Sequence, residues 1–134
     1  MRFFHLHYYK RYRMEVDLRR WQRSAAELDD YEFVHWSTDL LEAHAEVKFQ
    51  SFRDEFDSVV FPCLSDFSSC RRLMTEISRK RGFVPEATWL ARCVGSDART
   101  SEPCGTIQAI RVGRSQANIQ NLGVKPSHRG RGVG

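Results

Sequence analysis

The sequence has no long apolar run and none of the closely spaced cysteine pairs that bind zinc. No stretch approaches the ~18 consecutive apolar residues that cross a membrane, which argues against a membrane span. The four cysteines, Cys63, Cys70, Cys93 and Cys104, form no CxxC or CxxH pair, so a zinc site and a redox motif are not expected. We interpret them as buried free thiols of a reducing compartment, and we therefore expect a cytoplasmic protein without a metal.

Signals that would divide or export the chain are also missing. There is no repeat, no low-complexity tract and no linker rich in Pro, Gly and Ser. Residues 1–10 contain aromatic side chains, but two histidines interrupt them and no small-residue cleavage site follows, so secretion is not expected. With 41% hydrophobic and 28% charged residues, the 134-residue chain is predicted to form one globular domain, residues 1–134.

Acidic residues are absent from the last part of the chain. Residues 1–102 hold 16 basic and 17 acidic side chains, which is nearly neutral. Residues 103–134 hold five basic residues and no acid: Arg111, Arg114, Lys125, Arg129 and Arg131. This polarity indicates a partner that carries phosphates, such as a nucleic acid, an anionic membrane or a nucleotide-like cofactor.

The first half of the chain contains two strand patterns and two helix patterns. Residues 13–18 alternate apolar and charged side chains, residues 31–36 form a second strand candidate, and residues 24–30 between them are polar and fit a short helix or a loop. A helix is predicted over residues 39–59, with a core-facing stripe of Leu41, Ala45, Phe49, Phe52 and Phe56, and with Glu42, Glu46, Lys48, Arg53 and Asp54 on its other faces.

The second helix has clearer boundaries. Ser68 or Ser69 is the predicted N-cap, Gly82 the predicted left-handed residue after the C-terminus, and the apolar face consists of Cys70, Leu73, Met74 and Ile77. Strands are predicted over residues 87–94, 105–112 and 117–124, with a turn at residues 95–97, and Gly123 suggests a bulge or a close backbone approach. Their short connections favour an antiparallel meander, and the element order favours an α+β fold.

The last residues combine a strand end, a proline and a basic loop rich in glycine. After the strand, Val124-Lys125-Pro126 leads into Arg129-Gly130-Arg131-Gly132-Val133-Gly134. Glycines let successive backbone N–H groups point into one concavity, which is how a backbone binds a phosphate or pyrophosphate. The spacing fits neither the GxxxxGK[ST] phosphate loop nor the GxGxxG dinucleotide fingerprint.

These residues resemble motif A (V-x-P-x-x-[QR]-x-x-G-x-[GA]) of the GNAT superfamily of acetyl-CoA-dependent N-acetyltransferases. The resemblance implies a mainly antiparallel central sheet with flanking helices. It implies that the backbone of Leu122 and Val124 pairs with the pantetheine arm. It also implies that the loop binds the pyrophosphate of acetyl-CoA through Arg129, Gly130, Arg131, Gly132, Val133 and Gly134.

Such a family transfers an acetyl group to an amine by direct attack on the thioester in a ternary complex. The catalytic base is not identified, because the last strand offers only Asn118, Gln120 and Asn121. Glu86 and Glu15 remain remote candidates, and His128 is interpreted as a surface or phosphate contact. The acceptor, a small molecule or a protein amine, and a homodimer stay open, and neither a nucleic acid nor a membrane is expected as a partner.

The resemblance implies that motif A continues into a helix after Gly134. We therefore expect this chain to be the N-terminal part of an acetyltransferase that ends within motif A and has no activity alone. Micromolar acetyl-CoA binding with turnover would contradict that expectation. The alternative function is a basic nucleic-acid-binding protein that uses the Arg/Gly-rich C-terminus.

Overall fold

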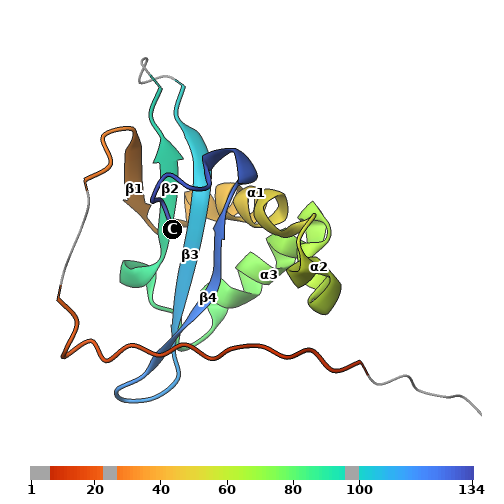
Figure 1. Ribbon diagram of the computed structural model, residues 1–134, viewed down its shortest axis with the longest axis vertical. Coiled ribbons are helices and arrows are strands. Elements are labelled where there is room, and N and C mark those ends of the chain that lie inside the picture. Colours follow the sequence, from red (N-terminus) through yellow and green to blue (C-terminus); the bar gives the residue numbers. More distant parts are fainter. Residues whose placement is uncertain (1–6, 23–26, 96–99) are drawn as a thin grey trace, which may run out of the picture.

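The computed structural model describes residues 7–22, 27–95 and 100–134 (Figure 1). Its strands are β1 (Tyr31–His35), β2 (Trp89–Cys93), β3 (Glu102–Arg111) and β4 (Ala117–Val124), and its helices are α1 (Leu41–Phe52), α2 (Phe56–Val60) and α3 (Phe67–Arg79). Short 3-10 turns cover Thr38–Leu40, Pro62–Leu64, Pro85–Ala87 and Pro126–His128. Most of the turn predicted at residues 95–97, and part of the polar segment 24–30, lie outside the described residues.

The four strands form one antiparallel sheet in the order β1-β2-β3-β4 (Figure 1). Strands that are consecutive in the sequence are therefore neighbours in the sheet, as the short connections predicted. The helices pack on one side, with α1 against both α3 and the strands β3 and β4. The predicted α+β class and the antiparallel meander are confirmed.

The helix predicted over residues 39–59 is wrong as a single element. The structure ends α1 at Phe52 and starts α2 at Phe56. The Ser58 hydroxyl of α2 donates to the carbonyls of Arg53 and Glu55 in the break, which offers the backbone there an alternative to helical hydrogen bonds. Phe56 consequently leaves the predicted core stripe and is 62% exposed.

The buried face of α1 also differs from the predicted one. His44, Ala45, Val47, Lys48 and Ser51 are buried, whereas Lys48 was expected on a solvated face. The helix contacts α3 on one side and β3 and β4 on another, so its buried arc is wider than a single apolar stripe. On the side that faces the sheet, the Lys48 side chain is fully buried and contacts Gln108 and Asn121.

The helix α3 buries Cys70, Met74 and Ile77, as its apolar period predicted, while Leu73 is half-buried. Its N-cap is Asp66, whose carboxylate accepts a hydrogen bond of 2.8 Å from the amide of Ser69, so the predicted serine caps are wrong.

Gly82, predicted as the left-handed residue after this helix, is not in the left-handed region. It allows a close approach instead, because a Cβ there would lie 2.2 Å from the carbonyl oxygen of Arg111.

The strand predicted at residues 13–18 is absent from the described structure. Residues 13–17 have no regular secondary structure, a turn begins at Leu18, and Met14 and Leu18 are 92% and 75% exposed. The segment docks instead through the Arg11 guanidinium, which lies 2.8 Å from the Asp57 carboxylate on α2. Alternation of side chains marks a strand only where another backbone is in reach to pair with it.

Candidate functional site

The end of β4 and the loop after it line a hollow of about 320 Å³ that is open to solvent. Seven of the eight residues predicted to bind the cofactor line it: Leu122, Val124, Arg129, Gly130, Gly132, Val133 and Gly134. His128 also lines it, whereas Arg131 does not. The local structure follows from the sequence, since Pro126 stops the strand and begins a 3-10 turn that reverses the chain.

Two glycines give this loop its shape. Gly130 and Gly132 have φ angles of +75° and +82°, a region that side chains other than glycine rarely adopt. Among the described residues, none accepts a hydrogen bond from the backbone amides of residues 130–134. Free amides in a concave, glycine-rich turn form a site for an anionic oxygen.

Arg129 fixes this loop to the rest of the fold rather than pointing into solvent. Its guanidinium donates to the carbonyl oxygens of Val124 at 3.0 Å and Ser51 at 2.8 Å, and it pairs with the Glu55 carboxylate at 2.7 Å. It therefore connects the end of β4 to the last turn of α1, where unpaired carbonyls attract a cation. Because Glu55 offsets its charge, Arg129 contributes more to holding the loop in place than to the positive potential at the hollow.

Arg131 is the exposed cation of the loop. A hydrogen bond from its side chain to Tyr31 raises the pKa of Arg131. The other basic residues of the acid-free segment are separated in space, since Arg111 and Arg114 lie at the β3–β4 turn, at the opposite end of β4 from the loop (Figure 1). The five charges thus form no continuous patch, and the loop's field comes mainly from Arg131.

His128 is buried, at 7% exposed, so its interpretation as a surface residue is wrong, whereas the alternative of a phosphate contact stays a prediction. Its Nδ1 shares a hydrogen bond of 3.1 Å with the Tyr31 hydroxyl, and its Nε2 lies 3.5 Å from the Glu102 carboxylate. Lys125 is also buried and places its ammonium 3.4 Å from Glu102. These contacts tie the turn after β4 to β1 and β3, and they engage both ring nitrogens of His128.

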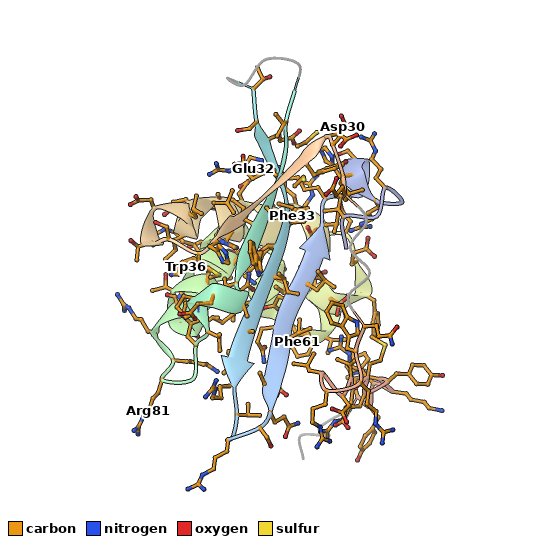
Figure 2. The ribbon with its side chains drawn as sticks, turned by 90° about the vertical axis from the view of Figure 1, so that its left-hand side faces the viewer. Asp30, Glu32, Phe33, Trp36, Phe61 and Arg81 are labelled. Atoms are coloured by element: carbon orange, nitrogen blue, oxygen red, sulfur yellow. The ribbon has the colours of Figure 1, made fainter. Side chains whose placement is uncertain are left out.

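A smaller apolar hollow of about 30 Å³ continues from the loop onto the sheet. Leu122, Val124 and Val133 line both hollows, and Phe33, Trp89 and Ile107 extend the smaller one across three strands. Figure 2 looks onto the strands with the helices behind them, and the labelled Phe33 lies on β1. Phe33 and Leu122 are 46% and 50% exposed, so apolar surface adjoins the anion-binding turn.

Sequence reasoning missed a buried polar cluster beneath this site. The Lys48 ammonium donates to the side-chain carbonyls of Gln108 and, at 3.2 Å, Asn121. The Gln108 amide lies 3.3 Å from Nδ1 of His44 and 2.6 Å from the Thr106 hydroxyl, which itself lies 2.7 Å from that Nδ1. The polar pair Thr106 and Gln108, two residues apart in a strand otherwise expected to be apolar, was the available signal.

No Asp or Glu side chain lines either hollow among the described residues. The remote base candidates Glu15 and Glu86 are exposed and lie outside the lining. In the part of the chain that the structure describes, no three His, Cys, Asp or Glu side chains gather in a way that would hold a metal ion. Within those same residues, no helix is both long enough and apolar enough to span a bilayer.

The architecture matches that of a solved acetyltransferase-like protein. Neither a protein-family model nor a curated protein matches the chain. A crystal structure of a predicted acetyltransferase from Pyrococcus horikoshii superimposes with a TM-score of 0.56 over 85% of this chain, at 19% sequence identity. The fold of the chain is therefore similar to that of an acetyltransferase. The match spans 34% of that longer protein, about a third of its length.

Proposed function

We propose that this chain is the coenzyme-binding part of an acetyl-CoA-dependent N-acetyltransferase of the GNAT type. The observation that carries the proposal is the turn after β4, where two left-handed glycines expose a run of unpaired amides beside a cation. The acetyltransferase-like fold supports it, because the turn that resembles motif A stands at the end of a strand of that fold.

In this proposal the amides of residues 130–134 bind the pyrophosphate of acetyl-CoA, and Arg131 adds positive charge beside it. The backbone of Leu122 and Val124 pairs with the pantetheine arm and orients the thioester carbonyl. The apolar hollow next to these residues suits the arm's methylene and methyl groups. An amine of the acceptor then attacks the thioester carbon directly, and coenzyme A leaves as the thiol.

Because the chain covers only about a third of the length of its structural neighbour, the test reads binding rather than turnover. Unlabelled coenzyme A is titrated into the ¹⁵N-labelled chain while amide chemical shifts are recorded. We expect shifts concentrated in residues 122–134. Gly132→Ala should weaken binding by about fivefold or more, because alanine strains the left-handed turn at φ +82°.

Two matched variants control this test. Gly113→Ala lies in the β3–β4 turn, where an added Cβ meets no atom within 4 Å, and should leave binding unchanged. Arg114→Gln removes a cation far from the loop, whereas Arg131→Gln removes the one beside it. Binding that drops equally with both arginine variants, or that needs RNA rather than coenzyme A, would favour the nucleic-acid alternative over acetyl transfer.

A further inference from the structure

The strand that borders the candidate site contains a bulge. In the pairing of β3 with β4, Gln108 faces Gln120 and Thr106 faces Gly123, so one residue on β3 opposes two on β4. Ile107 on β3 thus lies opposite both Asn121 and Leu122, so β4 holds one residue more than regular pairing would have. A bulge of this kind bends its strand and redirects the side chains and carbonyls that follow it.

Asn121 holds the bulge in an uncommon backbone conformation. Its φ is +51°, and no other described residue except glycine has a positive φ. The left-handed region places Cβ close to the carbonyl oxygen, and asparagine tolerates it better than most residues when its side chain is hydrogen-bonded. The conformation therefore depends on what holds the Asn121 amide.

That partner is Lys48, which comes from α1 on the helix side of the sheet. Lys48 is fully buried and its ammonium donates to the Asn121 side-chain carbonyl at 3.2 Å. Its second partner is the side-chain carbonyl of Gln108, which faces Gln120 immediately before the bulge. The lysine thus contacts both strands at the place where their register shifts.

Burying the Lys48 ammonium at this position costs free energy, because the cation loses its hydration. Among the described residues no carboxylate lies within ion-pair distance of it, so the cation is compensated by amide oxygens alone. Burial lowers the pKa of Lys48 to about 7, which expresses that cost. A buried, unpaired cation that contacts a strained residue at a binding-site edge is the pattern expected of a functional constraint.

We propose that Lys48 is a positioning residue: it holds Asn121 in the left-handed conformation and thereby sets the offset of Leu122 and Val124 at the candidate site. The structural part depends only on the bulge. Its consequence for coenzyme A rests on the proposed function.

The Asn121 site allows a direct test, because two substitutions there remove the acceptor of Lys48 but differ in backbone freedom. Hydrogen exchange of the amides of residues 120–124 is measured by NMR, with β1 as the internal reference. Asn121→Ala should speed exchange there about tenfold or more, since alanine disfavours a positive φ. Asn121→Gly should stay within about threefold of the natural protein, since glycine needs no clamp.

Lys48→Met tests the clamp from the other side. We expect the same local acceleration as for Asn121→Ala, and we expect the double variant Lys48→Met/Asn121→Gly to restore slow exchange to within about threefold. Thr106→Val is the matched control, because it disturbs the same buried cluster without touching the contact between Lys48 and Asn121. A residue that only fills space would not be rescued by glycine at position 121.

Two results would overturn the proposal: exchange that is equally slow in Asn121→Ala and Asn121→Gly, or acceleration in Lys48→Met that extends equally to β1. Should Lys48→Met fail to fold, the two substitutions at position 121 decide alone.

A coenzyme A titration of the same variants separates the two proposals. If the variants show the expected exchange differences but the natural protein does not bind coenzyme A, the proposed function is refuted and the positioning role of Lys48 stands. Equal binding by all variants with unchanged exchange refutes the clamp alone.

Discussion

Lys48 should make the stability of this protein rise with pH. Burial lowers the pKa of Lys48 from 10.5 to about 7. The unfolded chain keeps the ordinary value, so between these two pKa values it binds more protons than the folded protein does, and the free energy of unfolding increases as pH rises. Below about pH 7 both states carry the proton and the dependence ends.

The size of the effect follows from the two pKa values. At about 1.4 kcal/mol per unit, the full difference corresponds to on the order of 5 kcal/mol, of which roughly half falls between about pH 6.5 and pH 9. Other buried groups bound this window. Burial lowers the pKa of His44 to about 3 from 6.5, so its contribution ends near the lower limit. Burial raises the pKa of Cys70 and Cys104 to about 11 from 9, which acts with the opposite sign above the upper limit.

Urea unfolding of the natural protein and of Lys48→Met at several pH values in this window measures the effect. The natural protein should gain on the order of 2 kcal/mol from the lowest pH to the highest, and the variant should lack this gain. The comparison depends on the slope, since the variant also leaves the buried Gln108 carbonyl without its donor, which costs about 1–3 kcal/mol at every pH. If the free energy of unfolding gained across this pH window agrees within about 0.5 kcal/mol between the two proteins, the idea that Lys48 is buried without a charged partner is refuted.

Three further substitutions test the fold. His44→Asn should remove about 2 kcal/mol of the stability that the natural protein gains between roughly pH 4.5 and pH 6.5, measured as the difference between their unfolding curves, because neutral His44 is favoured by burial. Gly123→Ala should cost about 1–3 kcal/mol, because its Cβ would lie 2.9 Å from the Phe52 ring; Gly113→Ala, with open space around it, should cost less than about 0.5 kcal/mol in the same urea assay. Asp66→Ala should cost about 1 kcal/mol in thermal or urea unfolding, through the lost N-cap of α3.

The sheet and the loop were the most predictable parts of the structure. The last strand was predicted at residues 117–124 and observed at Ala117–Val124. Its limits are local, since the Gly113 turn precedes it and Pro126 cannot continue a ladder. The predicted loop residues other than Arg131 likewise line one hollow, because they are close together in the chain and glycines shape the turn that contains them.

The helices show where local patterns lose their information. The apolar stripe predicted a single long helix with Lys48 in solvent, yet α1 ends at Phe52 and Lys48 is buried. A one-dimensional period describes one covered face, whereas α1 is covered by both α3 and the sheet. The strand pattern at residues 13–18 is equally clear, and no strand formed because no described backbone pairs with it.

The sequence by itself determined the order of elements, the antiparallel meander and the glycine-rich turn, all of which depend on neighbours along the chain. Tertiary structure alone decided three things: that Arg129 pairs with Glu55, that the five basic residues separate to the two ends of β4, and that Lys48 meets Asn121 beneath the bulge. Each depends on residues far apart in sequence, and the balance between desolvation and hydrogen bonding that governs them exists only after the chain has packed.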